Sequence, residues 1–279
     1  MTLTIFIALI LLGLVTGFYS GLIGTGGNVI LIPVLDIVFS HYHVTGPESV
    51  KFIIANSLFI TVFLGLAVSA KQYRMGNFYI KEILTIGIPG MISAFLLSEW
   101  IIASTWYEKH YFDLIFLSLL VFLTLRLLLI KSKENQEENT EKTMPGKLPL
   151  ILLGLLTGSI TSLSGLGGGV ILIPFLTDAL GVPIRKASSV SIGVVMLLAL
   201  SVSISYLFVD TVHIEQVLPW QMGYTSMFII LPVLIGMAFS SSYGVKVAHR
   251  TSPFKLRVIF GIIMAILCIK LAYGLVVNL

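Results

Sequence analysis

Two glycine-rich segments are the residues of this chain best suited to bind a ligand. They are Gly24-Thr25-Gly26-Gly27-Asn28 and Gly165-Leu166-Gly167-Gly168-Gly169, and an apolar run follows each of them. Glycine adopts positive φ without strain and lets a ligand approach the backbone closely. Where such a turn opens a helix, unpaired N–H groups and the positive end of the helix dipole favour an anion. The two segments therefore predict an anion site made of main-chain donors; the alternative is that the glycines only allow tight packing of each hairpin.

The glycine segments belong to a longer internal repeat. Residues 13–35 and 154–176 are identical at 14 of 23 positions. A repeated turn between apolar runs is typical of membrane carriers built from two related halves. The repeat continues into the next predicted helix, where Ala55-Asn56-Ser57 aligns with Ala187-Ser188-Ser189. Asn56, Ser57, Ser188 and Ser189 could complete the coordination of an oxyanion at matched helix starts, or equally cap or bridge helices.

The composition is that of an integral membrane protein. Hydrophobic residues make up 57% of the chain and charged residues 11%, and the mean hydropathy is +1.02. Soluble domains are roughly 45–50% apolar and 25% charged. Long apolar runs recur from end to end, which predicts one all-α polytopic membrane protein without a separate soluble domain.

The sequence carries no motif of an enzyme or a metalloprotein. There is no Gly-x-Ser-x-Gly, His-Glu-x-x-His or Walker run, so we expect no catalytic residue and no cofactor. Cys268 is the only cysteine, and His41 and His43 have no evident third ligand, so we expect no metal site. The net charge of +4 fits lysines and arginines in cytoplasmic loops and gives no reason to expect a nucleic-acid partner.

Apolar periodicity predicts five helical elements in each half of the chain. The first transmembrane repeat is residues 1–130, a charged tether occupies 131–147, and the second repeat is 148–279. The elements are expected at 3–22, 28–39, 51–70, 80–100 and 112–130, and at 148–163, 169–180, 187–208, 218–243 and 256–276. The second element of each half has about 12 residues, or about 18 Å, too short to cross roughly 30 Å of hydrocarbon alone.

Small residues recur at every fourth position of the first helix in each half. They are Gly13, Gly17 and Gly21, and Gly154, Gly158 and Ser162. A small-xxx-small pattern is typical of helices that approach one another closely. We expect these faces to pack rather than bind a ligand.

The basic residues predict the orientation of the chain in the membrane. Four regions hold 14 of the 17 lysines and arginines: the connection around 71–81, the end of the first half with the tether, residues 185–186, and the connection around 246–257. All four alternate correctly if they are cytoplasmic. The first two elements of each half then form a hairpin broken at its glycine turn, and the two halves are inverted repeats. Both termini are expected outside and the tether inside.

With the shared Val-Ile-Leu-Ile-Pro continuation at 29–33 and 170–174, the paired turns resemble the TauE/SafE family of sulfite exporter-like permeases. The likeness covers the whole length, and it matches the family pattern at Gly24, Gly26, Gly27, Gly165, Gly167 and Gly168. It implies transport of sulfite, sulfoacetate or related organosulfonates, generally in the export direction. Asn28 stands where the second half has Gly169, so the two half-sites are chemically unequal.

Three hypotheses for function follow. The leading one is a secondary transporter in the cell membrane that binds a small anion between the two glycine turns and alternates access. The second is a passive anion channel on the same scaffold. The third is a membrane scaffold that transports nothing and uses the tether for docking. The expected partners are a small anionic substrate and the lipid bilayer; the sequence carries no signal of oligomeric state.

Overall fold

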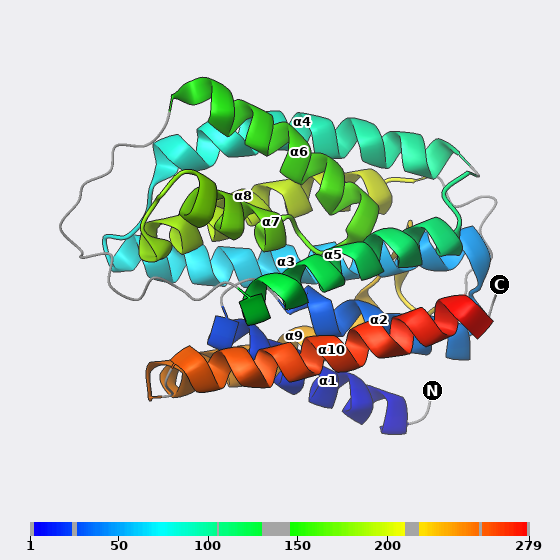
Figure 1. The fold of residues 1–279 in the computed structure, drawn as a ribbon. Coiled ribbons are helices and arrows are strands. Elements are labelled where there is room, and N and C mark those ends of the chain that lie inside the picture. The colour runs from blue at the N-terminus through cyan, green and yellow to red at the C-terminus, as the bar shows by residue number, and fades with distance from the viewer. Residues whose placement is uncertain are drawn as a thin grey trace.

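The computed structural model describes residues 3–23, 27–104, 106–129, 146–209, 218–250 and 253–277, and Figure 1 shows their arrangement. The first half contains α1 (Leu3–Ile23), α2 (Asn28–His41), α3 (Gly46–Arg74), α4 (Ile80–Ala103) and α5 (Lys109–Leu129). The second contains α6 (Lys147–Ser164), α7 (Gly169–Pro174), the π-helix η1 (Phe175–Ala179), α8 (Ile184–Leu207), β1 (Gln221–Met222), β2 (Thr225–Ser226), α9 (Met227–Arg250) and α10 (Pro253–Val277). Gly24, Thr25 and Gly26 and tether residues 131–145 lie outside the described residues.

The protein is an all-α polytopic membrane protein. Within the described ranges, five helical segments are long and apolar enough to cross a bilayer: Leu3–Ser20, Gly46–Arg74, Ile80–Ala103, Lys147–Ser164 and Lys186–Leu207. Shorter apolar helical segments cover Asn28–His41, Gly169–Ala179, Met227–Ser241 and Gly261–Leu275. The second elements, α2 and α7 with η1, are short as the sequence predicts.

The main helix contacts cross between the two halves. Helix α1 packs against α9, and α6 packs against α4; α3 packs against α8, and α5 packs against α10 (Figure 1). These four pairs are unchanged when α1–α5 are exchanged with α6–α10, as expected of two related repeats. Helix α4 also packs extensively against α8, whereas its counterpart, α3 against α9, is a small contact. Opposite orientation of the halves in a membrane stays a prediction.

Small residues allow the α1–α9 and α4–α6 contacts, which confirms the packing role predicted for their glycines. A Cβ added at Gly13 would lie 2.2 Å from the carbonyl oxygen of Val233 in α9. A Cβ at Gly158 would lie 2.2 Å from the carbonyl oxygen of Gly90 in α4. Both distances are far below a van der Waals contact, so only glycine fits where these backbones touch.

Two helix starts differ from the sequence prediction by five residues or more. Helix α3 begins at Gly46 rather than near residue 51, because Thr45 is extended at the N-cap and Pro47 suits the first helical turn. Helix α9 begins at Met227 rather than at 218. The residues before it form the hairpin of β1 and β2, in which Gln221 pairs with Ser226 and Gly223 has a φ of 56°.

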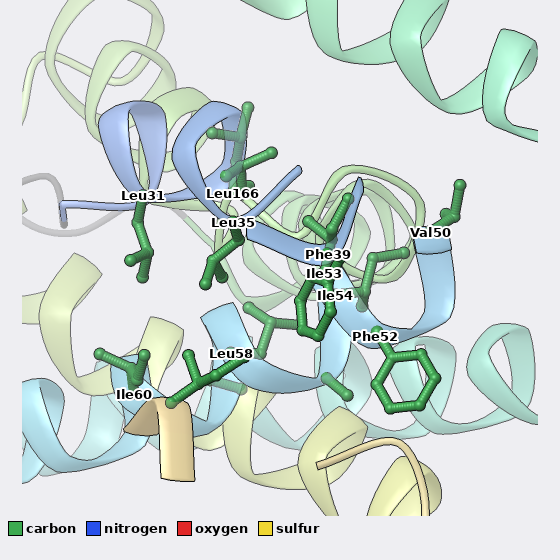
Figure 2. Close-up of a cluster of buried hydrophobic side chains, with 14 of the residues drawn as sticks. Leu31, Leu35, Phe39, Val50, Phe52, Ile53, Ile54, Leu58, Ile60 and Leu166 are labelled. Atoms are coloured by element: carbon green, nitrogen blue, oxygen red, sulfur yellow. The ribbon is translucent and has the colours of Figure 1, made fainter. Parts of the chain in front are cut away.

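The larger buried cluster joins both halves around α2 and α3. It contains Leu31 and Leu35 of α2, Ile54 and Leu58 of α3, and Leu166 from the turn between α6 and α7 (Figure 2). Leu166 is only 2% exposed, so the second glycine turn is anchored in a core that is formed mainly by first-half residues. The fold therefore brings the second turn against the broken hairpin of the first half.

Candidate anion site at the glycine turns

The second glycine turn has a backbone that only glycine adopts readily. Gly165, Gly167 and Gly168 have φ values of 67°, 80° and 61°. Gly165 ends α6 in the left-handed conformation, and its N–H donates to the carbonyl of Thr161 at 2.9 Å. Gly168 begins α7, and its carbonyl accepts the N–H groups of the first helical turn. All five residues from 165 to 169 are buried.

The first glycine turn is described from Gly27 onward. The carbonyl of Gly27 accepts the N–H groups of Ile30 and Leu31 at 3.1 and 3.0 Å and so opens α2. A Cβ added at Gly27 would lie 2.8 Å from the carbonyl oxygen of Thr16 in α1. Gly27 therefore lets α1 and α2 approach closely at the turn, and Asn28 is the first residue of α2.

Asn28 joins the two turns directly. Its side-chain Nδ2 donates to the carbonyl oxygen of Gly165 at 2.8 Å, although the two residues are 137 positions apart in the sequence. Its Oδ1 lies 3.0 Å from the hydroxyl of Thr61, which donates to it. Asn28 is 2% exposed and Thr61 is 3% exposed, so this chain of hydrogen bonds is shielded from water.

Ser57 and Thr61 contact the second turn from α3. The Oγ of Ser57 lies 3.1 Å from the position that a Cβ added to Gly165 would occupy. The methyl carbon of Thr61 lies 3.7 Å from the position that a Cβ added to Gly167 would occupy. Thr61 is absent from the residues that the sequence proposes. Its signal is the spacing of four from Ser57, which puts both side chains on one helix face.

The hydroxyl of Thr61 has two acceptors and one proton. Besides Asn28 Oδ1, it lies 2.8 Å from the carbonyl of Ser57 one helical turn earlier. A hydroxyl donates one hydrogen bond at a time, so its proton can turn between the helix backbone and a group in the site. Thr61 is therefore able to donate to a ligand without leaving its own helix unsatisfied.

The other polar residues proposed from the repeat lie elsewhere. Asn56 faces the hairpin of β1 and β2, where its amide bonds the backbone of Tyr224 and Ser226. Ser189 donates to the carbonyl of Asn77 in the α3–α4 connection, and Ser188 beside it is half-buried. Ser188 and Ser189 lie four and five residues inside α8, whereas Asn56 and Ser57 lie ten and eleven residues inside α3, so the four are not at matched helix starts.

Ser188 and Ser189 are also distant from the turn along α8. The α8 residue against Gly167 is Val195, whose Cγ1 lies 3.0 Å from the position of a Cβ on that glycine. Six residues separate Ser189 from Val195, which is about 9 Å along a helix axis. Of the four polar residues, only Ser57 contacts the glycine turn.

Tyr107 supports the second turn from the α4–α5 connection. Its hydroxyl donates to the carbonyl of Leu163, two residues before Gly165, at 2.5 Å. Burial, and secondly the carboxylate of Asp113, raise the pKa of the Tyr107 phenol above its ordinary value. The phenol therefore stays protonated and keeps its role as a donor at physiological pH.

Helix α5 forms ion pairs with both short second elements. Near its start, Lys109 pairs with Asp36 of α2. Near its end, the Nε of Arg126 lies 3.0 Å from Asp178 of η1. The same helix thus contacts the broken hairpin of each half outside the glycine turns.

One apolar cavity lies apart from the turns. It has a volume of about 280 Å³ between α1 and α2. Its lining is Ile5, Ala8, Leu9, Leu12, Val34, Ile37, Val38, His41 and Tyr42. Because almost all of these side chains are apolar, the cavity does not offer the donors that a small anion needs.

The turns, by contrast, gather neutral hydrogen-bonding groups at a buried meeting point. Asn28, Ser57 and Thr61 offer amide and hydroxyl groups, and the second turn is broken backbone held inside protein. Irregular backbone among membrane helices is tolerated where it is buried in protein or lines a cavity. Fold and site together define a polytopic α-helical membrane protein with a buried polar contact between its two halves.

The chain belongs to the sulfite exporter TauE/SafE family, whose match covers residues 9–271. It is 29% identical over 264 residues to a probable membrane transporter protein of Methanocaldococcus jannaschii, covering 93% of this chain and 92% of that protein. It is 26% identical over 272 residues to a probable membrane transporter protein of Haemophilus influenzae, covering 96% and 98%. No solved structure matches the chain. The protein is therefore a membrane transporter and not an enzyme.

Proposed function

We propose that the protein is a secondary transporter of small oxyanions, of which sulfite, sulfoacetate and related organosulfonates are the leading candidates. The observation that carries the proposal is the hydrogen-bonded contact of Asn28 with Gly165 and Thr61. It joins the two glycine turns at a buried point where neutral donors converge. Such donors suit the oxygen face of an anion, and the family name supports a sulfur oxyanion.

The contact between the turns is the closed form of the site in this proposal. Asn28 Oδ1 takes the position of a substrate oxygen and accepts a hydrogen bond from the Thr61 hydroxyl. A bound oxyanion replaces it, so Asn28 turns away from Gly165 and the hairpins separate. Alternating access then moves one half against the other, as inverted repeats permit. We further propose the plasma membrane as the location and export as the direction.

The test is flux of sulfite and sulfoacetate into proteoliposomes, comparing the wild type with Thr61→Val. Valine keeps the shape of threonine and removes the hydroxyl, so we expect a KM about tenfold higher, as the loss of roughly 1.4 kcal/mol predicts. The matched control is Thr124→Val, because the Thr124 hydroxyl also bonds the carbonyl four residues earlier, at 2.8 Å, but lies in α5. Equal KM values for the two variants would remove Thr61 from the site.

The same vesicles distinguish the alternatives. Saturable uptake with counterflow supports a carrier, whereas conductance that does not saturate supports a passive channel. A membrane scaffold shows neither saturable uptake nor conductance. Deletion of the charged centre of residues 131–147 would then abolish docking to its partner. A bulky side chain at the turn, Gly167→Leu, is expected to stop flux, because Val195 already lies 3.0 Å from the position of a Cβ there.

A further inference from the structure

One buried side chain, Asn56, joins the hairpin of β1 and β2 to α3. Nδ2 of Asn56 donates to the carbonyl of Tyr224 at 2.9 Å, and Oδ1 of Asn56 accepts the N–H of Ser226 at 2.9 Å. The two backbone groups flank Thr225, so the amide pairs with the hairpin as a neighbouring strand would. Asn56 is completely buried, and it lies five residues from Thr61, or about 7.5 Å along α3.

An aromatic layer packs under the hairpin. The ring of Tyr224 meets Phe52 of α3 edge-on at 5.3 Å between centroids, and Tyr206 of α8 at 5.8 Å. The N–H of Tyr224 also donates to the carbonyl of Tyr206 at 3.0 Å. Burial and the nearby carboxylate of Glu48 raise the pKa of the Tyr224 phenol. The hairpin therefore covers this end of the α3–α8 contact with a neutral aromatic layer.

Two hydroxyl groups where the hairpin meets this layer have no hydrogen-bond partner among the described residues. The side-chain oxygens of Tyr206 and Thr225, both on completely buried residues, make no hydrogen bond to any described residue. The same holds for Ser203 and Ser205 in α8, whose side chains point to nearly opposite sides of that helix. Buried polar groups in proteins are almost always hydrogen-bonded, so the two hydroxyls at the hairpin call for a partner that binds there transiently.

We propose that the hairpin is a lid over one end of the substrate path, and that the hydroxyls of Tyr206 in α8 and of Thr225 in the lid itself donate to the oxyanion in transit. This rests on the proposed transport function. Asn56 holds the lid shut by its two bonds to the hairpin backbone. Because α8 starts in a loop predicted to be cytoplasmic, the lid lies at the outer end of the path.

The lid is tested by thiol labelling. In a Cys268→Ala background, Thr225→Cys is treated in proteoliposomes with a membrane-impermeant anionic thiol reagent. We expect slow labelling with Asn56 present and at least tenfold faster labelling with Asn56→Ala. The control is Ser98→Ala, which removes an equally buried hydrogen bond, to Ser162 at 3.1 Å, between α4 and α6. It is expected to leave the rate within twofold; equal rates for Asn56→Ala and the control overturn the lid.

A milder variant decides the matter if Asn56→Ala does not fold. The Gln221 side chain braces the hairpin by donating to the carbonyl of Gly223 at 3.1 Å and accepting the N–H of Leu218 at 3.2 Å. Gln221 is only half-buried, so Gln221→Ala removes this brace without opening the core. It is expected to speed labelling at least threefold, and an unchanged rate overturns the proposal.

The path is tested separately with Tyr206→Phe. Since the Tyr206 hydroxyl has no partner in the part of the chain that the structure describes, its removal is expected to leave the melting temperature unchanged and to raise the KM for sulfoacetate flux at least threefold. Tyr273→Phe, at an exposed position of α10, is the control. An unchanged KM overturns the role of Tyr206. If the protein transports but Asn56→Ala does not speed the labelling of Thr225→Cys, only this inference is refuted. If Asn56→Ala speeds the labelling but no saturable flux is found, the transport function is refuted.

Discussion

Asn28 of the first half donates its side-chain amide to the main-chain carbonyl of Gly165 in the second half, 2.8 Å away. The residue that the repeat aligns with Asn28 is Gly169, which has no side chain and cannot return the contact. Two glycine turns of common origin have therefore become unequal: one supplies backbone, and the other supplies backbone and an amide. In the proposed mechanism this inequality makes Asn28 the group that substrate must displace.

Replacing Asn28 with alanine is expected to weaken both the fold and transport. The change leaves the Gly165 carbonyl without its side-chain donor and removes the acceptor of the Thr61 hydroxyl, and a buried group left unsatisfied costs about 1–3 kcal/mol in the free energy of unfolding. Thermal unfolding in detergent and flux in vesicles measure the two effects. Asn77→Ala is the control, since it removes a half-buried side-chain bond to Gln72. Wild-type stability and flux in Asn28→Ala would contradict the proposed role of the contact.

Alanine at Gly168 is expected to strain the second turn. The left-handed conformation, with φ at 61°, costs an L-residue about 1–2 kcal/mol, and the new Cβ would lie 2.8 Å from Oγ1 of Thr161. A lower melting temperature is the expected result. Gly274→Ala in α10 meets nothing within 4 Å and is expected to leave stability equal or higher. If the two variants have the same melting temperature, the turn does not require glycine at position 168.

The ion pair between α5 and η1 is expected to be weak and sensitive to salt. Arg126 and Asp178 are partly exposed, with side-chain exposures of 21% and 43%, and such pairs contribute about 0.2–1 kcal/mol. A double-mutant cycle with Arg126→Ala and Asp178→Ala measures the coupling by thermal unfolding, and 0.5 M salt should reduce it. Coupling well above this range would mean that the pair is shielded from water, for example by lipid.

The inverted repeat predicts where reporters lie. A reporter fused to the amino terminus is expected outside, and one inserted in residues 131–147 is expected in the cytoplasm, because the first half makes an odd net number of crossings. Protease protection in sealed vesicles of known orientation shows on which side of the membrane each reporter lies. Detection of both reporters on the same side would contradict the inverted arrangement, while the helix pairing of the two halves would still stand.

The local sequence predicts much of this architecture. The 14 identities between residues 13–35 and 154–176 establish two related halves, and the hydropathy establishes the membrane class. Small residues at spacings of four predict the close helix contacts, as at Gly13 and Gly158. These features depend on helix period, on the length of an apolar run and on the conformational freedom of glycine, which neighbouring residues determine among themselves.

The partners of the polar residues depended on the tertiary structure. Asn56 and Ser57 are adjacent in sequence, yet successive side chains on a helix point about 100° apart, so Asn56 bonds the hairpin and Ser57 contacts the glycine turn. Asn28 finds Gly165 only because α2 and the second turn share a core around Leu35 and Leu166. The sequence determined which groups could donate, and the packing of the two halves decided which acceptor each one meets.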